Sequence, residues 1–438
     1  MKQSFFKIYN KIKEDETLVS LNKGLFISFG GQILAFIFAT LLHILFARAA
    51  GPSNYGIYAY ASSWILLFAL ISKFGFGSAL MRFIAAYEAK KDWALLKGII
   101  IRSHQFSFSI NLVFGSAIVI VFFLLKGETG LNITSVLIPA MFLGIAMTHL
   151  QLISSTLLGL RQVFLAKFIS PVFRPVILSI VLGGFLLFPE KKVTGLDLIA
   201  FDAVATSLLV FVSAFFLYKK IPVIVRSTKA HFQSREWVSV TFPLFLLGLV
   251  QVAITQTDIL MLGSLSGLKN AGIYNAVTKI SFILTYMLIS VNVVIAPLIS
   301  RFYSLGEITK IKKIFRFIRI LLATLSVPAA VALIIFSDLF LSVFGDDFSS
   351  GASALKIVVL GKLVSVIAGP VGFLYTMTDN HIIALKVFGF SAVLNIVLNY
   401  YFIKLWGING AALASTITLI FWNVILITFS KKKFGCFI

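Results

Sequence analysis

Long apolar runs alternate with short polar segments along almost the whole chain, beginning near residue 24. Most of these runs are close to the roughly 20 residues that an α-helix needs to cross the hydrocarbon core of a bilayer. The pattern therefore predicts an all-α polytopic membrane protein. The twelve predicted spans are 24–47, 56–76, 104–125, 135–157, 164–188, 195–217, 240–264, 272–299, 319–341, 354–377, 382–404 and 407–429.

Lysine and arginine gather in every second polar segment. The basic segments are the N-terminal tail, 77–103, 158–168, 218–239, 300–319, the turn at Lys386 and the C-terminal tail. The segments between them hold few basic residues. Because basic loops of membrane proteins remain in the cytoplasm, both termini are predicted to be cytoplasmic.

A motif in the first half of the chain returns in the second half. The repeated residues are Gly51, Asn54, Gly56, Ile57 and Tyr58, and they reappear 216 residues later as Gly267, Asn270, Gly272, Ile273 and Tyr274. Because each half has an even number of spans, the halves share one orientation and are parallel repeats. The predicted organisation is a cytoplasmic tail (1–23), a six-helix bundle (24–217), a cytoplasmic linker (218–239), a second six-helix bundle (240–429) and a basic tail (430–438).

Composition supports this class and excludes others. The chain is 59% hydrophobic and 12% charged, with a mean hydropathy of +1.01, which is too apolar for a soluble domain of 438 residues. Its net charge of +22 reflects the basic cytoplasmic loops, so no nucleic-acid partner is expected. The single cysteine, Cys436, excludes an intramolecular disulfide. A polar tail precedes the first apolar run, so no cleavable signal peptide is expected. The sequence shows no metal-ligand cluster and no catalytic arrangement, and an enzyme is not expected.

Charged residues inside the predicted spans are the candidates for function. They are Lys73, Arg174, Lys279, Lys356, Lys362, Asp202 and Asp258. An ionisable group in hydrocarbon is costly and normally faces a bundle interior or water. Arg174 and Lys362 lie deepest among the basic residues, whereas Lys73 and Lys356 lie near span ends, where long side chains also reach the interface.

The excess of basic over acidic residues in the spans predicts a cationic cavity at mid-membrane. Such a cavity suits an anionic solute, with phosphate or pyrophosphate as the obvious candidate. Asp258 and Lys279 both fall in the outer third of the membrane, so a structural Asp258–Lys279 pair with the other charges scattered is the alternative. Asp258 and Asp202 are also candidates for binding Na⁺ or a proton.

Several motifs resemble those of the Wzx-type polysaccharide and O-antigen flippases, which belong to the MOP superfamily. The resemblance rests on Arg48 to Ala61, Phe74 to Gly77, Arg82 to Ala85, Gln256 to Asp258, Gly267, Gly272 to Lys279, and Gly407 to Ala412. It covers nearly the whole chain and includes the number of spans. The superfamily's lipid II flippases usually have fourteen spans, and no extra pair is present here.

The resemblance implies two six-helix bundles in a V, as in MATE-like transporters, around a cationic cavity. It implies alternating access that turns an undecaprenyl-pyrophosphate-linked oligosaccharide across a bacterial cytoplasmic (inner) membrane, with membrane lipids and a polysaccharide polymerase as partners. The predicted substrate-binding residues are Arg48, Lys73, Arg82, Arg174, Lys279 and Lys362. Of these, Arg48, Arg82 and Lys279, together with Asp258, fall in family-like motifs, whereas Arg174 and Lys362 rest on depth.

Two other functions are considered. A MATE-like drug or cation antiporter of the same superfamily would prefer acidic residues in its cavity, and here basic residues are in excess. A membrane polysaccharide polymerase would need a sizeable outer loop or an acidic catalytic cluster, and the sequence shows neither. No cofactor is expected beyond coupling to a Na⁺ or proton gradient.

Overall fold

The computed structural model describes residues 16–124, 133–187, 192–378 and 380–434, and these residues form helices without any strand. The helices are α2 (Glu16–Lys73), α3 (Phe76–Lys90), α4 (Trp93–Leu124), α5 (Ile133–Gly159), α6 (Val163–Phe168), α7 (Arg174–Leu186), α8 (Gly195–Lys220), α9 (Val223–Ser227), α10 (Ser234–Leu265), α11 (Leu268–Ser304), α12 (Ile308–Ile335), α13 (Ser337–Ser342), α14 (Ala352–Ala368), α15 (Val371–Thr376) and α16 (His381–Phe434), with a π-turn η1 (Ile169–Phe173) and a 3₁₀ turn η2 (Asp346–Gly351). Within this described part, nine helices are long and apolar enough to cross a membrane. Residues 1–15 and 435–438 of the predicted tails, including Cys436, lie outside it.

Two of the helices each contain two predicted spans. The 58-residue helix α2 covers the first span and most of the second, and it bends at Gly51, where φ is 71°. Glycine adopts this left-handed conformation without steric cost, and the following Pro52 suits the first turn of a new helical segment. Helix α16 likewise covers the last two spans and bends at Gly407, where φ is 53°.

Proline interrupts some spans and leaves others continuous. The span at 164–188 is divided into α6, η1 and α7, with Pro171 inside the π-turn and Pro175 two residues after its end. Pro370 follows the break between α14 and α15. Because proline lacks a backbone N–H and clashes with the preceding turn, both breaks have a local cause. Helix α12, by contrast, runs unbroken through Pro328.

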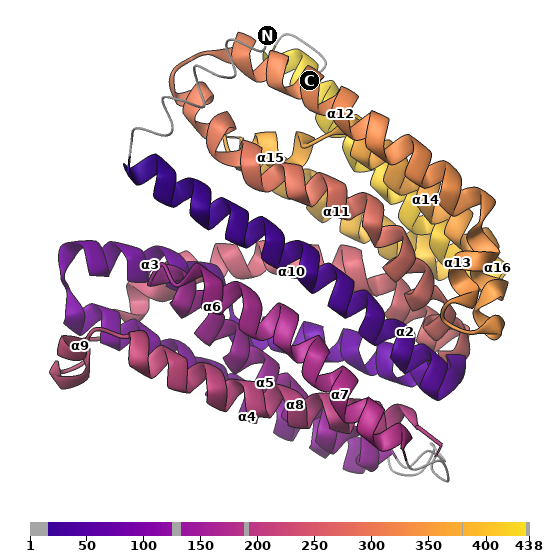
Figure 1. Cartoon of the computed structure of the whole chain (residues 1–438), viewed down its shortest axis with the longest axis horizontal. Helices are drawn as coiled ribbons and strands as arrows, with labels where there is room; N and C mark the ends of the chain where they lie inside the picture. Colours follow the sequence, from indigo (N-terminus) through magenta and orange to yellow (C-terminus); the bar gives the residue numbers. More distant parts are fainter. Residues whose placement is uncertain (1–15, 125–132, 188–191, 379, 435–438) are drawn as a thin grey trace.

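The helices form two halves, α2–α8 and α10–α16, which α9 connects (Figure 1). Helices α3 and α9 lie at one end of the molecule and α13 lies at the other. At the first end, the Nζ of Lys97 donates to the carbonyls of Arg226 and Thr228 at 2.7 and 2.9 Å, and the indole of Trp237 donates to the Tyr87 hydroxyl at 2.9 Å. The basic segments 77–103 and 218–239 therefore lie together, and we call this end the basic end. We call the opposite end the outer end, after the orientation that the positive-inside rule predicts.

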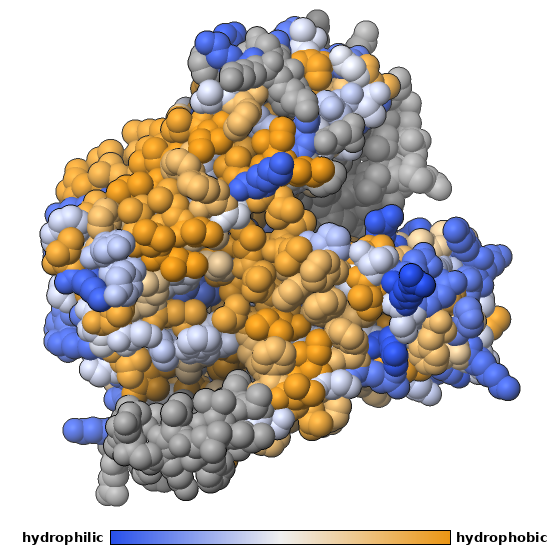
Figure 2. All heavy atoms as spheres, turned by 180° about the vertical axis from the view of Figure 1, so that it is seen from behind, coloured by the Kyte–Doolittle hydropathy of each residue, from blue (hydrophilic) through white to orange (hydrophobic). Residues whose placement is uncertain are grey.

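The outside of the molecule suits a lipid environment. Figure 2 shows apolar side chains across the middle of the surface and hydrophilic ones toward its ends. Large apolar side chains such as Phe211 and Leu187 are 74% and 80% exposed. Exposure on this scale would be unfavourable in water, and it agrees with a multi-pass membrane protein.

The two copies of the repeated motif touch each other at the outer end. A Cβ on Gly56 would lie 1.8 Å from the carbonyl oxygen of Leu268, and a Cβ on Gly272 would lie 2.3 Å from that of Pro52. Gly267 has a φ of 96°, so it repeats the left-handed conformation of Gly51. The backbones of α2 and α11 therefore meet where only glycine fits, and this glycine junction joins the halves.

Other glycines allow close packing between α2 of the first half and α10 of the second. Cβ atoms on Gly75, Gly248 and Gly263 would lie within 3 Å of atoms in Thr241, Leu70 and Tyr60, respectively. The part of α2 after its bend thus packs closely along α10. The paired glycines that suggest close packing in the sequence differ from these: Gly30, Gly183 and Gly184 have no neighbour within 4 Å of a Cβ, and only Gly31 is crowded, by Phe168.

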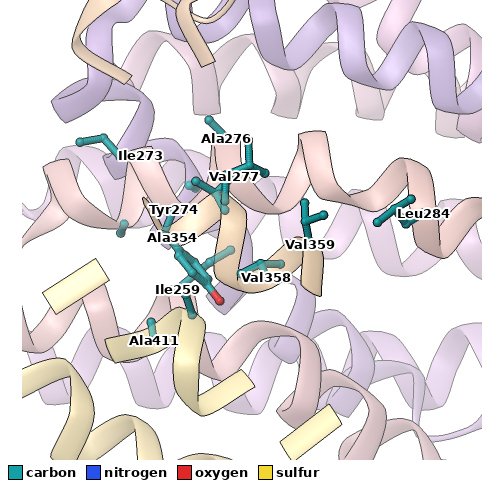
Figure 3. Close-up of a cluster of buried hydrophobic side chains, with 14 of the residues drawn as sticks. Ile259, Ile273, Tyr274, Ala276, Val277, Leu284, Ala354, Val358, Val359 and Ala411 are labelled. Atoms are coloured by element: carbon teal, nitrogen blue, oxygen red, sulfur yellow. The ribbon is translucent and has the colours of Figure 1, made fainter. Parts of the chain in front are cut away.

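The largest buried apolar cluster among the described residues contains side chains from both halves. In the second half, Tyr274 of α11 lies among Ile259 of α10, Ala354 and Val358 of α14 and Ala411 of α16 (Figure 3). All five side chains are at most 5% exposed. This packing fixes the helices from which the cavity below is built.

Candidate functional site

A cavity of about 640 Å³ lies between the two halves. Helices α2, α5 and α7 line it from the first half, and α10, α11, α14 and α16 line it from the second. Its volume lies within the usual range of ligand pockets. Figure 2 shows the surface notched between the halves at the basic end.

Side chains from both halves close the cavity toward the outer end. The hydroxyls of Tyr60 and Ser264 are 3.1 Å apart, and the Ser63 hydroxyl donates to the Gln256 side chain at 2.9 Å. Asn275 donates to the Tyr55 hydroxyl at 2.9 Å, and both of these residues are buried. Together with the glycine junction, these hydrogen bonds hold the halves in contact on the outer side of the cavity.

Two lysines give the cavity its uncompensated positive charge. Lys362 on α14 donates to the Ser281 hydroxyl at 2.9 Å, and its Nζ lies 5.7 Å from the centre of the Phe282 ring. Lys279 on α11 has no hydrogen-bond or ion-pair partner among the described residues. Coulomb repulsion acts between Lys279 and Lys362 and between Lys279 and Arg174, while Asp258 attracts Lys362. An anion in the cavity would relieve this repulsion.

Arg174 also lines the cavity, but its charge is already paired. Its Nε donates to one carboxylate oxygen of Asp202 at 2.8 Å, and its Nη2 donates to the other. Such a bidentate pair is among the stronger charged contacts in proteins. Thr206 and Tyr58 donate their hydroxyls to the same carboxylate at 3.1 and 2.9 Å. Asp202, on α8, is fully buried behind Arg174.

Asp258 has neutral partners instead. It accepts hydrogen bonds from the Tyr274 hydroxyl at 2.9 Å, the Asn399 amide at 2.8 Å and the Ser415 hydroxyl. Within the described ranges, the ion pairs closer than 4.0 Å are Arg174–Asp202 and Lys310–Glu307, so Asp258 and Lys279 do not form the pair considered from the sequence. The side-chain oxygen of Asn399 is buried without a hydrogen-bond partner.

The remaining three sequence candidates lie away from the cavity. Arg48 is exposed at the outer end, where its Nε donates to the Val343 carbonyl at 2.7 Å and so links the two halves. Lys73, the last residue of α2, donates to the Gln151 side chain at 2.8 Å. Arg82 is exposed on α3. The structure therefore brings Arg174, Lys279, Lys362 and Asp258 together around the cavity, with Asp202 directly behind Arg174.

Two tyrosines were not selected from the sequence as site residues. Tyr58 and Tyr274 both line the cavity, and each donates its hydroxyl to a buried carboxylate. They occupy equivalent positions of the repeated motif, so the repeat could have identified them as candidate site residues. Their aspartate partners gave no such signal, because Asp202 and Asp258 come from helices that are not equivalent in the repeat.

The chain matches two protein families. The family described as "polysaccharide biosynthesis protein" matches residues 21–303, and the family described as MatE matches residues 243–401. A search of curated proteins finds no match.

The fold is similar to solved structures of MOP superfamily transporters. An inward-facing multidrug resistance MATE family transporter has a TM-score of 0.74 at 12% identity, over 92% of this chain and 94% of that one. An outward-facing MATE family transporter has a TM-score of 0.63 at 13% identity, over 95% of each chain. A MOP superfamily transporter from Pyrococcus furiosus, in which reverse polarity of the binding pocket suggests a different function, has a TM-score of 0.63 at 12% identity, over 95% of each chain.

These likenesses confirm the resemblance seen in the sequence. The first family covers most of the chain, and the helices have the fold of the superfamily's solved transporters. The chain therefore belongs to the polysaccharide biosynthesis protein family of membrane transporters, with the fold of the MOP superfamily.

Proposed function

We propose that the protein is a flippase for an undecaprenyl-pyrophosphate-linked oligosaccharide, such as an O-antigen, capsule or exopolysaccharide repeat unit. It moves this lipid from the inner to the outer leaflet of the bacterial cytoplasmic membrane and so supplies a polysaccharide polymerase. The observation that carries the proposal is the pair of uncompensated lysines, Lys279 and Lys362, in a cavity between the two halves.

The lining of the cavity offers both kinds of contact that such a substrate needs. The two ammonium groups suit a pyrophosphate, because they supply donors and positive charge to its oxygens. The amides of Gln32 and Gln256 and the ring of Trp422 also line the cavity. Amides hydrogen-bond to sugar hydroxyls, and an aromatic face packs against a sugar ring.

The sign of the cavity's charge is our argument against the alternative function of a drug antiporter. The MatE match and the multidrug MATE neighbours favour that alternative. A cationic drug, however, would meet two lysines that have no ion-pair partner among the described residues, and one carboxylate, Asp258, that neutral donors already contact. Pocket polarity is also the feature tied to a different function in the P. furiosus transporter.

The conformation fits one state of an alternating-access cycle. If the basic end faces the cytoplasm, as the positive-inside rule indicates, the closed outer end makes this an inward-facing state. The higher similarity to the inward-facing MATE transporter than to the outward-facing one agrees with this. Outward opening then requires the glycine junction of α2 and α11 to separate.

Asp258 is our candidate for coupling to a Na⁺ or proton gradient. A buried carboxylate without a direct ion-pair partner is costly, so it favours binding a cation or a proton. The unpartnered oxygen of Asn399 lies on a side chain whose amide donates to that carboxylate. It therefore offers a second acceptor for a cation beside Asp258.

The test is deletion of the gene, followed by analysis of lipid-linked intermediates on each leaflet of the cytoplasmic membrane. Complete repeat units should accumulate on the inner leaflet. Repeat units that reach the outer leaflet but remain unpolymerised would instead identify a polymerase. Normal surface polysaccharide together with new sensitivity to cationic drugs would identify an antiporter.

Complementation with lysine variants links this activity to the cavity. Lys279→Gln and Lys362→Gln should each reduce translocation while the protein remains in the membrane. Lys269→Gln on α11 and Lys356→Gln on α14 are matched controls, because each removes a lysine from the same helix outside the cavity lining. Equal activity of all four variants would remove the argument from cavity charge.

A further inference from the structure

The two halves present the same tyrosine–carboxylate pair to the cavity. Tyr58 donates to Asp202 and Tyr274 donates to Asp258, each with a distance of 2.9 Å. The tyrosines occupy equivalent positions of the repeat, and both carboxylates are buried, with exposures of 0% and 7%. The polar environment of the two pairs is therefore comparable.

The pairs differ in the source of positive charge. In the first half, the guanidinium of Arg174 contacts both oxygens of Asp202. In the second half, the partners of Asp258 are hydroxyl and amide groups, and none of the described basic residues lies within 4.0 Å of it. One carboxylate thus forms an ion pair within the chain, whereas the other has no ion-pair partner among the described residues and is attracted to Lys362 only from beyond 4.0 Å.

We propose that Arg174 is a tethered counter-cation that closes the Asp202 site to mobile cations, so that the transporter exchanges a cation only at Asp258. Arg174 is then a positioning residue that sets how many cations move per cycle, and it is not itself a ligand of the substrate phosphate. Only the statement about Asp258 rests on the proposed function.

The geometry supports this role over that of a substrate ligand. Both Asp202 oxygens are engaged by Arg174, and its Nε also reaches the Thr206 hydroxyl at 3.1 Å. The charge of the guanidinium is already neutralised by Asp202, and a phosphate that took over its Nε and Nη2 donors would leave a fully buried carboxylate without charge compensation, which is strongly unfavourable. Removal of Arg174 would leave the carboxylate with the hydroxyls of Tyr58 and Thr206, a set of oxygens that suits a monovalent cation.

The experiment measures the number of Na⁺ ions bound by the purified full-length protein, using ²²Na⁺ at pH 6 and pH 9. The wild type should bind one ion, and Asp258→Asn should bind none. Arg174→Ala should bind one more ion than the wild type, at least at pH 9, where protons compete least. The additional ion should be lost in the Arg174→Ala/Asp202→Asn double variant.

Guanidinium ion provides a second readout that a purely structural role of Arg174 would not affect. Millimolar guanidinium should displace the additional Na⁺ from Arg174→Ala and leave Na⁺ binding to the wild type unchanged. If Arg174→Ala does not fold alone, it should be recovered when purified with guanidinium present, and the double variant should fold without it.

The outcomes separate this inference from the proposed coupling at Asp258. A wild type that binds no Na⁺, with an Asp202-dependent ion in Arg174→Ala, would remove the coupling site and leave the role of Arg174 intact. Equal Na⁺ binding by Arg174→Ala and the wild type at both pH values would overturn the inference. Failure of guanidinium to compete with Na⁺ in that variant would also overturn it.

Discussion

Substitution of Gly56 by alanine should shift the protein toward the state with an open outer end. The added Cβ would lie 1.8 Å from the Leu268 carbonyl oxygen and 3.2 Å from the Gly272 nitrogen. Both are backbone atoms, so neither rotates away as a side chain would. The clash exists only while α2 and α11 touch, and it therefore penalises the closed outer end alone.

The size of the shift can be estimated because the clash affects only one of the two conformations. Alanine improves helix propensity by about 1 kcal/mol relative to glycine, but it does so in both conformations, and the gain cancels from the equilibrium between them. Overpacking costs about 1–3 kcal/mol at a well-packed site. A free-energy difference of this size corresponds to a roughly 5- to 150-fold shift in the population ratio. The short distance places Gly56→Ala toward the upper part of this range.

Labelling of a single cysteine measures the shift. Thr255 is exposed and lines the cavity, so Thr255→Cys in a Cys436→Ser background reports access from either side. A membrane-impermeant maleimide added outside intact cells should label the reporter faster when Gly56 is alanine. Gly272→Ala, with its Cβ 2.3 Å from the Pro52 carbonyl oxygen, should act in the same direction.

Gly30→Ala is the matched control. It lies in the same helix, and nothing is within 4 Å of its Cβ position, so it should leave labelling unchanged. If Gly56→Ala is labelled no faster from outside than Gly30→Ala, the glycine junction does not hold the outer end closed and the reasoning is refuted.

Three further predictions use other contacts. Arg48→Ala should also increase labelling of the Thr255→Cys reporter from outside. The increase should be less than about fivefold, because an exposed hydrogen bond contributes under about 1 kcal/mol. Arg48→Lys keeps the charge but not the Nε donor, so it should be labelled as fast as Arg48→Ala. Asp258→Asn should abolish any stimulation of flipping by a Na⁺ or proton gradient, measured in vesicles with an imposed gradient, and unaltered stimulation would exclude this site. Trp237→Phe should lower the apparent Tm in detergent, since the Tyr87 hydroxyl loses its indole donor in a buried site, at a cost of about 1–3 kcal/mol; an unchanged Tm would show that the hydroxyl finds another partner.

The positions of the helices could be predicted from the sequence, because a run of apolar residues shows where a membrane span begins and ends. Each predicted span falls in one or more helices of the structure. The repeat was also visible in the sequence, but the contact between its two copies was not predicted and came from the structure. The bends also had a local cause, as the φ values at Gly51 and Gly407 show. The break between α12 and α13, after Ile335, could not be predicted in this way. The proline of α12, Pro328, lies seven residues earlier, and the helix continues through it.

The site was only partly readable, because a sequence gives the depth of a charge and not its direction. Depth selected Arg174 and Lys362, which both line the cavity. It also placed Asp258 and Lys279 at similar heights, yet Asp258 is bonded to Tyr274, Asn399 and Ser415. Which of two facing residues forms a pair depends on the rotation of each helix, and that is set by packing against its neighbours.

Pairing of Arg174 with Asp202 illustrates the same limit. The two residues are 28 positions apart on consecutive helices, and each was selected separately from its depth. Their bidentate contact neutralises one of the cations on which the sequence argument depended. The positive charge of the cavity therefore rests on Lys279 and Lys362, a conclusion that required side-chain contacts.

The position of the glycine junction has a consequence for how the chain is held together. The linker containing α9 joins the halves at the basic end, whereas the glycine junction and its hydrogen bonds lie toward the outer end. The covalent link at the basic end is thus complemented by non-covalent contacts between the halves at the opposite end as well. The two halves should accordingly reassemble when produced as separate polypeptides divided within the linker, and a gene split at that point should still encode a working transporter.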